Sequence, residues 1–224
     1  MSKILVVPDV HGRDFWKKPC LNWDGEIAFL GDYHDPYPYQ CSKEKSIENL
    51  KEIVEFAEKN QNRCYFLIGN HDCCYLGIKC PLGGRTDWYH RKEVSDLLRK
   101  LETTYVLIKD DCLFSHSGIL PEWLKAWRLD YHLNLMSPNH LAWEDVSPYR
   151  GGISHSGVGS VLFGDVREYA EHEHLPGFYQ IFGHTQLEKD PIIEKDFACL
   201  DCRQCFIVDT KTHEIIPYGN CNDE

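Results

Sequence analysis

The sequence predicts an α/β protein built as a mixed-sheet β-sandwich, or as one mixed sheet, flanked by helices. Short apolar runs bounded by polar or turn residues recur along the chain, and such runs are typical of buried strands. In the first half they alternate with amphipathic segments of helical periodicity, which indicates helices layered against a sheet. Closely spaced pairs of runs in the second half favour antiparallel strands, so we expect the pairing to be mixed.

The individual elements follow from these patterns in chain order. Strands are expected at residues 4–7, 27–30, 65–68, 106–108, 113–115, 180–182 and 206–208. Residues 42–60 place Ile47, Leu50 and Ile53 on one face of a predicted amphipathic helix, and residues 94–101 repeat the pattern more briefly.

The second half of the chain adds two expectations about organisation. Antiparallel pairing is expected within residues 106–115 and within residues 197–218. Residues 121–150 are rich in tryptophan and contain no clear strand, which predicts a helical excursion near the active site. No repeat, low-complexity segment or linker divides the sequence, so we expect residues 1–224 to form a single domain.

Composition excludes several classes of protein. With 42% hydrophobic and 26% charged residues among 224, the chain is too rich in core-forming residues to be disordered. Lys and Arg number 24 against 35 Asp and Glu, which gives a formal charge of −11 and makes binding to nucleic acid or to an anionic membrane unfavourable. The first residues hold no apolar run long enough for a signal peptide, so we expect a cytoplasmic protein.

The cysteine content supports the same compartment. Eleven cysteines cannot all pair within one chain, which favours a reducing environment with free thiols. Cys199, Cys202 and Cys205 have a spacing that could belong to a zinc or iron–sulfur site with a fourth ligand. Because they lie in or beside an apolar, β-rich run, we favour the alternative that they pack as small hydrophobic residues.

Polar side chains follow five of the expected strands at their carboxyl ends. They are Asp9 and His11, then Asp32 and Asp35, then Asn70, His71 and Asp72, then His116, and finally His184. Ligands of open α/β sheets bind outside the carboxyl ends of the strands, so these groups are expected to converge on one site. Each cluster has a glycine beside it, which suits close approach of the backbone. Asp72 alone has the simpler alternative of a turn-forming residue.

The chemistry of this set points to metal ions. Carboxylate, amide and imidazole donors without cysteine suit Mn, Fe, Zn, Ni or Mg. The set is larger than one tetrahedral site requires, and a central carboxylate such as Asp32 can bridge two ions about 3.5–4 Å apart. Two divalent metal ions, with Mn the first choice, are therefore the expected cofactors.

Five short motifs then carry a resemblance to a known family. They are Asp9-Val10-His11-Gly12, Gly31-Asp32-Tyr33-His34-Asp35, Gly69-Asn70-His71-Asp72, Ser115-His116-Ser117-Gly118 and Gly183-His184-Thr185. In this order and spacing they resemble the blocks of the calcineurin-like metallophosphoesterases, whose fold is a four-layer sandwich. Residues 141–145, followed by the pairs Arg150-Gly151 and Phe163-Gly164, resemble the phosphoprotein phosphatase branch. That branch includes small bacterial and phage serine/threonine phosphatases and diadenosine tetraphosphate hydrolases.

The resemblance implies a role for each ligand. It implies that Asp9, His11 and Asp32 hold one metal ion, and that Asp32, Asn70, His116 and His184 hold the other. His71 would be the general acid that protonates the leaving oxygen, oriented by Asp35, and a metal-bridging hydroxide would attack phosphorus directly. A histidine beside a carboxylate agrees with this role, since the carboxylate favours the charged imidazole and sets its tautomer.

The sequence departs from the family where substrate is bound. The family continues with Arg-Gly after the residue matching Asp35, and that arginine clamps phosphate, whereas Pro36 and Tyr37 stand here. The candidate replacements for substrate binding are Arg150, Arg13 and His34. His34 has the alternative of a solvated loop residue, and a register counted from residues 163–164 places Gly157 rather than Arg150 at the second arginine position.

These observations lead to one function and two alternatives. We expect a dinuclear metal-dependent hydrolase of phosphate monoesters, acting on a phosphoprotein or a small phosphorylated compound. A nucleotidase or dinucleoside polyphosphate hydrolase is the alternative, because aromatic side chains near the motifs could stack a base or simply pack. Those aromatic residues are Tyr33, Tyr37, Tyr39, Trp88 and Trp143. A non-catalytic metal-binding relic is disfavoured, since every ligand and the proposed acid are present.

Overall fold

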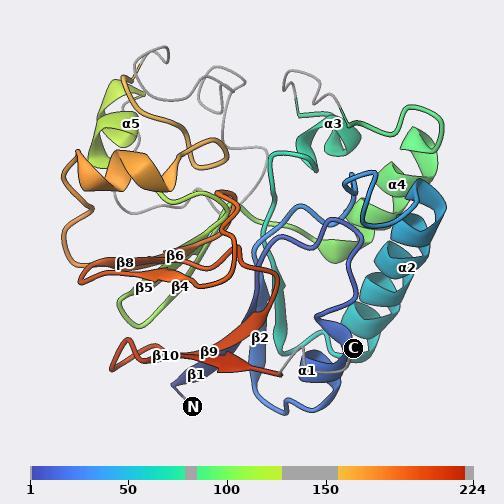
Figure 1. Ribbon diagram of the computed structural model, residues 1–224, viewed down its shortest axis with the longest axis horizontal. Coiled ribbons are helices and arrows are strands. Elements are labelled where there is room, and N and C mark those ends of the chain that lie inside the picture. The colour runs from blue at the N-terminus through green and yellow to red at the C-terminus, as the bar shows by residue number, and fades with distance from the viewer. Residues whose placement is uncertain (1, 79–84, 128–155, 220–224) are drawn as a thin grey trace.

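Two five-stranded mixed sheets form the centre of the computed structural model, which describes residues 2–78, 85–127 and 156–219 (Figure 1). The first sheet contains β1 (Lys3–Val7), β2 (Glu26–Phe29), β3 (Cys64–Phe66), β9 (Cys205–Asp209) and β10 (Ile215–Tyr218), in the order β10-β9-β1-β2-β3. The second contains β4 (Val106–Lys109), β5 (Cys112–Ser115), β6 (Tyr179–Phe182), β7 (Ile192–Ile193) and β8 (Phe197–Cys199), in the order β4-β5-β6-β8-β7. The predicted sandwich of mixed sheets flanked by helices is confirmed.

Parallel pairing at the centre of both sheets sets the position of the site. Strands β1, β2 and β3 are parallel neighbours, and so are β5, β6 and β8. Strand β9 runs antiparallel to β1 and to β10, and β4 runs antiparallel to β5. The loops that follow β1, β2, β3, β5 and β6 are the segments that carry the candidate ligands.

The pairing expected within residues 197–218 is only partly correct. Strands β9 and β10 are antiparallel as predicted, but β8 belongs to the second sheet, where it pairs in parallel with β6 and antiparallel with β7. The chain crosses between sheets after Cys199. Local sequence shows that both segments are apolar and extended, but it does not show which sheet each one joins.

Helices cover the outer face of each sheet. They are α1 (Lys17–Leu21), α2 (Lys43–Lys59), α3 (Cys73–Leu76), α4 (Arg91–Leu98), α5 (Pro121–Ala126) and the 3-10 segments η1 (Arg99–Leu101) and η3 (Val166–Ala170). Helices α2 and α4 lie on the side of the first sheet, and α5 lies above the second (Figure 1). The predicted helix over 42–60 is confirmed: Ser42 caps α2 by accepting a hydrogen bond from the Lys45 amide at 3.2 Å.

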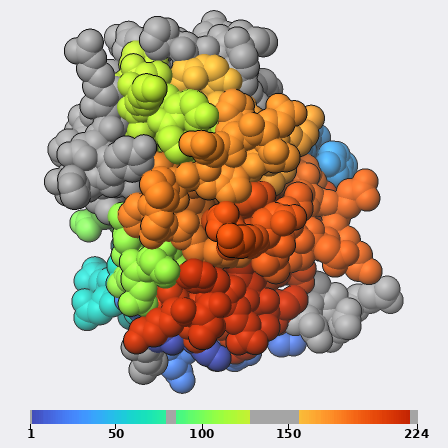
Figure 2. Space-filling view, turned by 90° about the vertical axis from the view of Figure 1, so that its left-hand side faces the viewer, coloured from blue at the N-terminus to red at the C-terminus, as the bar shows by residue number. Residues whose placement is uncertain are grey.

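Three buried apolar clusters bind these layers together. One lies between the sheets and includes Val6, Phe114 and Phe206, which are fully buried. A second packs α2 and α4 against the first sheet, and a third packs α5 and the segment around η3 against the second. Among the described residues, the face seen in Figure 2 is formed mainly by residues 156–219, coloured orange to red. The structure therefore has four layers, with helices outside and two sheets inside.

The structure bears in part on the predicted excursion over residues 121–150 and on membrane-spanning helices. Of the excursion predicted over 121–150, residues 121–127 are described and contain the short helix α5, whereas residues 128–150 lie outside the described residues. Among the described helices, none combines the length and the apolar character that crossing a bilayer would require.

Candidate metal centre

Three strand-end loops adopt strained backbone conformations at four residues predicted as ligands or as acid partner. The φ angles of His11, Asp32, Asp35 and His184 are +46°, +54°, +56° and +61°, in the left-handed region that non-glycine residues seldom occupy. Such strain persists where surrounding contacts hold it, and it collects at functional sites. Here the loops hold one another, since the His11 amide donates to the Asp32 carbonyl at 2.7 Å.

Glycine is required where two of these loops meet. A Cβ atom on Gly69 would lie 2.1 Å from Oδ1 of Asp32, and one on Gly183 would lie 2.3 Å from Oδ1 of Asp9. Both distances are far below any van der Waals contact. The backbone therefore packs directly against the carboxylates, as expected from the glycine beside each polar cluster.

Asp32 lies at the centre of the predicted ligands. Two groups of possible ligands share it. One group adds His11 and His71, and the other adds His116 and His184. Within each group the possible ligand atoms lie within 4.8 Å of one another. Oδ2 of Asp32 is 3.4 Å from Nε2 of His11 and 3.7 Å from Nε2 of His116. The structure thus places a carboxylate between two imidazole clusters, which is the arrangement of a bridging ligand.

The histidine on one side of Asp32 presents a lone pair to the site. Nδ1 of His11 lies 3.0 Å from the His34 carbonyl, so this nitrogen carries the hydrogen and Nε2 faces Asp32 as an acceptor. Burial lowers the pKa of His11 to about 3, with Asp32 opposing the change, so the ring is neutral. An imidazole lone pair and a carboxylate oxygen facing each other at 3.4 Å fit a cation bound between them.

The other side shows the same arrangement. Nδ1 of His116 lies 2.8 Å from the Leu30 carbonyl, which leaves its Nε2 as an acceptor. That Nε2 lies 3.0 Å from Oδ1 of Asn70 and 3.0 Å from Nδ1 of His184, and the last two atoms are also 3.0 Å apart. Because the amide oxygen and the His116 nitrogen both lack a hydrogen to share, the donor set fits a bound cation.

Asp9 lies beside these clusters as a buried carboxylate. It is 1% exposed, and its Oδ1 accepts a hydrogen bond from the His184 amide at 3.0 Å. Burial raises its pKa, the His116 ring lowers it, and neighbouring Asp32 adds to the rise. For Asp32 itself burial raises the pKa, but the surrounding histidines outweigh burial and lower it overall. A second cation would relieve the repulsion between the two carboxylates.

His71 and Asp35 form a hydrogen-bonded pair next to the candidate metal ligands. Nδ1 of His71 lies 2.9 Å from Oδ2 of Asp35, whose other oxygen accepts a hydrogen bond from the Tyr75 hydroxyl. The His71 amide donates to Oδ1 of Asp32 at 2.9 Å, which ties the pair to the bridging carboxylate. Burial lowers the pKa of His71, but Asp32 and the bond to Asp35 outweigh burial, so the pKa is raised overall.

Asp72 has a structural role that goes beyond a turn. Its Oδ2 accepts hydrogen bonds from the amides of Asp32 and Gly69, each at 2.8 Å, and its Oδ1 accepts one from Tyr33 at 3.2 Å. The side chain is 1% exposed. Asp72 therefore fastens the loop that carries Asp32 to the loop that carries Asn70 and His71.

The candidate substrate residues have different surroundings. Arg13 is largely tied to its own loop, with Nη2 donating to the Asp9 carbonyl and lying 3.9 Å from Oδ1 of Asp201. Its Nη1 has no hydrogen-bond partner in the part of the chain that the structure describes. His34 is 1% exposed, with Nδ1 2.7 Å from the Ser46 hydroxyl, so the solvated-loop alternative is wrong. Its burial gives no support to substrate contact. Arg150 lies outside the described residues.

The aromatic residues considered for base stacking also separate. Tyr33 is fully buried and donates its hydroxyl to the Leu67 carbonyl at 2.8 Å, which makes it a core residue. Tyr39 and Trp88 are 76% and 52% exposed. Tyr37 lies edge-on to His11 with ring centroids 5.3 Å apart, and Trp143 is outside the described residues.

The cysteines behave as packing residues. Cys199, Cys202 and Cys205 are buried, and none of them belongs to a group with metal-binding geometry in the part of the chain that the structure describes. Burial raises the pKa of the Cys199 and Cys202 thiols. The zinc or iron–sulfur alternative therefore finds no support.

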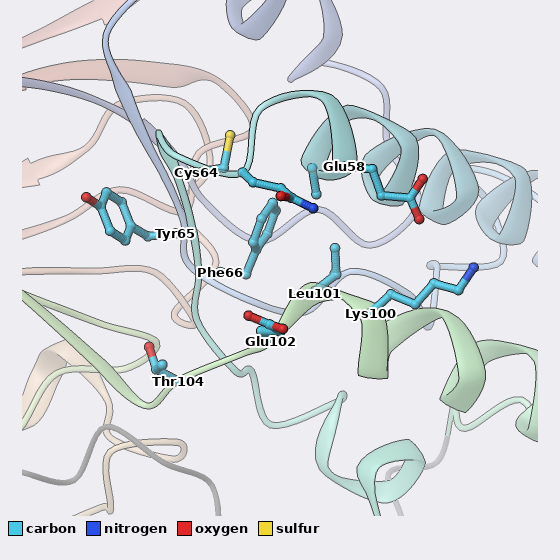
Figure 3. Close-up of a pocket in the computed structure, with 10 residues that line it drawn as sticks. Glu58, Cys64, Tyr65, Phe66, Lys100, Leu101, Glu102 and Thr104 are labelled. Atoms are coloured by element: carbon cyan, nitrogen blue, oxygen red, sulfur yellow. The ribbon is translucent and has the colours of Figure 1, made fainter.

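Two other features lie apart from the metal centre. Asp111, Cys112 and His213 form a third group of possible ligands, but Asp111 is exposed and pairs with His213 at 3.0 Å. A pocket of about 300 Å³ lies between the end of α2, β3 and η1, with Glu58, Lys100 and Glu102 in its lining (Figure 3). Its lining includes no residue predicted for the site.

Comparison with known proteins agrees with this geometry. The model of the calcineurin-like phosphoesterase family matches residues 2–188, which is most of the chain. The chain belongs to the calcineurin-like phosphoesterases. It is thus a member of a family of generally metal-dependent hydrolases, as the motifs predicted. The family binds dinuclear metals, and this phosphoesterase presents two groups of Asp and His side chains that could hold an ion.

Solved structures show the same fold at low sequence identity. A cold-active protein-tyrosine phosphatase from a psychrophilic Shewanella species is 16% identical with a TM-score of 0.59, and the match covers 97% of this phosphoesterase and 77% of that chain. A point mutant of a cold-active protein tyrosine phosphatase gives 17% identity, a TM-score of 0.58 and the same coverage. No curated protein matches this phosphoesterase.

The sequence motifs do not indicate one group that lies beside His71. Nη2 of Arg85 lies 3.0 Å from Nε2 of His71, and its guanidinium stacks on Tyr37 with Cζ 3.7 Å from the ring centroid. Arg85 lies outside all five motifs, and no spacing rule relates it to Tyr37 or His71. The position of Arg85 beside His71 depends on how residues 85–87 fold back toward Asp35, which the sequence alone does not show.

Proposed function

We propose that this phosphoesterase is a dinuclear metal-dependent phosphatase that hydrolyses phosphate monoesters of a phosphoprotein or a small compound. The observation that carries the proposal is the set of acceptors that face one another around Asp32, next to a histidine that hydrogen bonds to Asp35. The first part fits two cations, and the second fits a proton donor placed beside them. Neither part alone would distinguish hydrolysis from simple metal storage.

The ligands divide into two sets that share Asp32. Asp9, His11 and Asp32 would hold one ion, and Asp32, Asn70, His116 and His184 would hold the other. The mixture of carboxylate, amide and imidazole donors supports Mn, with Fe, Zn, Ni and Mg as further candidates. When bound, such ions would supply Lewis acidity toward the phosphoryl oxygens and lower the pKa of coordinated water.

The protein's own contribution is to position the proton donor. His71 would give the proton on Nε2 to the leaving oxygen, because Nδ1 is occupied by Asp35 at 2.9 Å. Asp35 is fully buried and is held in turn by the Tyr75 hydroxyl, so the ring is fixed in one orientation. Arg13, whose Nη1 has no partner among the described residues, would be a further contact for the phosphate.

One observation keeps the nucleotide alternative in view. Tyr39 is 76% exposed, and its ring lies 5.8 Å from that of Tyr37, which itself touches His11. An aromatic rim of this kind could stack a nucleobase. It would serve a nucleotidase or a dinucleoside polyphosphate hydrolase with the same metal centre.

We also propose a phosphorylated substrate as the partner and the cytoplasm as the location. The residues Cys20, Cys41, Cys64, Cys112, Cys199 and Cys202 carry free thiols. Free thiols in this number support a reducing compartment. The net charge of −11 supports the exclusion of long nucleic acids as substrates.

A substrate panel with a matched variant tests the function. The metal-loaded protein is assayed with phosphomonoesters, phosphodiesters, phosphopeptides and dinucleoside polyphosphates in the presence of Mn²⁺. We expect monoester hydrolysis that falls about 10²–10⁴-fold in His71→Gln, with metal content retained, because only the proton donor is lost. Exposed Glu173→Gln serves as the control. Metal binding without turnover of any ester would contradict the proposal, and a preference for dinucleoside polyphosphates would favour the alternative.

A further inference from the structure

Arg85 occupies an unusual position between the proposed acid and an aromatic ring. Its Nη2 lies 3.0 Å from Nε2 of His71, and its Cζ lies 3.7 Å above the ring of Tyr37. Its Nε is buried and has no hydrogen-bond partner among the described residues. A buried guanidinium donor without a partner is costly, so the position is poised for an acceptor that the described residues do not supply.

The contact with His71 is incompatible with the proposed proton transfer. Arginine has donors only, so Nε2 of His71 must accept from Arg85, while Nδ1 donates to Asp35. The same Nε2 is the atom that would face the leaving oxygen of a substrate. Arg85 must therefore move away from His71, or rotate, when a substrate enters.

Tyr37 holds the guanidinium in reach of the site. The ring lies edge-on to the ligand His11 at 5.3 Å, and a guanidinium stacked on an aromatic face keeps its in-plane donors available. Tyr37 comes two residues after Asp35, in the stretch where Pro36 and Tyr37 replace an Arg-Gly pair. The position that lacks a guanidinium of its own thus supplies the ring on which another guanidinium rests.

We propose that Arg85 binds the phosphoryl group of the substrate, and that binding draws it off His71 so that Nε2 can take up a proton from solvent and face the leaving oxygen. This inference rests on the proposed phosphatase function. A doubly charged phosphoryl group offers several oxygens to a planar fork of donors, which makes it a stronger acceptor than a neutral imidazole. Arg85 is then a specificity-determining contact for an anionic substrate, and Tyr37 is its positioning residue.

Oxyanion binding tests the inference without relying on turnover. Tungstate or inorganic phosphate is titrated calorimetrically into the Mn²⁺-loaded full chain, with bound Mn²⁺ measured in every variant. Arg85→Ala is expected to raise the Kd about tenfold to hundredfold, since a charge-assisted bond to phosphate is lost, while metal content stays unchanged. Arg91→Ala is the matched control, because Arg91 also stacks on an aromatic ring, that of Trp88 at 5.3 Å, and donates to a backbone carbonyl.

Kinetics separate a direct contact from a structural role. For a phosphomonoester, Arg85→Ala is expected to raise KM and lower kcat, and added guanidinium ion is expected to restore part of kcat/KM. Tyr37→Ala should reproduce most of the Arg85→Ala effect, and the conservative Tyr37→Phe, which keeps the ring face, should recover most of the kcat/KM that Tyr37→Ala loses. Rescue by a free guanidinium would not follow if Arg85 only stabilised the fold.

The outcomes distinguish this inference from the proposed function. Native turnover together with unchanged tungstate affinity in Arg85→Ala would overturn the role of Arg85 and leave the phosphatase intact. Tungstate binding that depends on Arg85, without hydrolysis of any ester, would overturn the phosphatase and support the anion contact. A native protein that binds Mn²⁺ but neither tungstate nor phosphate would overturn the role of Arg85.

Discussion

Replacing Asp72 by alanine should damage both stability and metal affinity, because Asp72 joins two ligand-bearing loops. The substitution removes three hydrogen bonds, from the amides of Asp32 and Gly69 at 2.8 Å each and from Tyr33 at 3.2 Å. The three donors lie at a buried position, since Asp72 is 1% exposed. Among the described residues, no second acceptor takes a hydrogen bond from any of these three amides.

The magnitude follows from the donors left behind. Each unpaired buried donor costs about 1–3 kcal/mol, so three would cost at most about 9 kcal/mol. Two effects reduce this sum. Water can enter the space that the carboxylate leaves, and removal of Asp72 relieves its repulsion with Asp32, which together with burial raises the pKa of Asp72 well above its usual value. We therefore expect a loss of about 3–5 kcal/mol, which corresponds to a fall in Tm of about 10 °C.

Thermal unfolding and metal titration measure the two consequences separately. The Tm is compared in chelator for the native chain, Asp72→Ala, Asp72→Asn and the exposed control Asp24→Ala. Asp72→Asn keeps one oxygen for the two short bonds, so it should lose only about 1–2 kcal/mol. Affinity for Mn²⁺ should fall about 10–100-fold in Asp72→Ala, because the loop that carries Asp32 loses its support. If Asp72→Ala unfolds at the same temperature as Asp24→Ala, the bracing role is refuted.

Three further predictions concern the metal centre and the thiols. Gly183→Ala should lower Mn²⁺ affinity about tenfold or more, because the new Cβ would lie 2.3 Å from Oδ1 of Asp9, and native affinity by calorimetry would contradict this packing. Removing divalent ions by chelation should lower Tm, and restoring Mn²⁺ should raise it, because a bound ion would bridge the acceptor atoms that face one another around Asp32. An unchanged Tm would count against a metal centre. Burial raises the pKa of Cys112 to about 12, so its thiol stays protonated as pH rises from 7 to 9. Iodoacetamide labelling of Cys112, followed by mass spectrometry, should stay slow over that range relative to Cys41, and a steep rise with pH at Cys112 would show that its pKa is lower.

The strands and the ligand-bearing loops were predictable because their signals are local. A buried strand needs a short apolar run, and the loop after it needs residues that tolerate a tight turn, so the segments around Asp9, Asp32 and His116 could be read directly from the chain. The five motifs also recur in order, which made the family accessible before any distance was known. The structure brings these loops together around Asp32 as expected.

What the linear pattern left undecided depends on contacts between distant segments. Apolar character is the same for β8 and β9, and only pairing with β6 or β1 decides which sheet each strand joins. The sequence pattern likewise left undecided the hydrogen bonds of Asp72, the tautomers of His11 and His116, and the stacking of Arg85 on Tyr37. Apart from the bond between Gly69 and Asp72, these contacts join groups far apart in the chain, and the energy of a hydrogen bond or a stacked cation depends on geometry and burial that exist only after folding. The sequence therefore determined which candidate metal-ligating side chains are present. The tertiary fold decided which of their acceptor atoms face one another without a hydrogen between them.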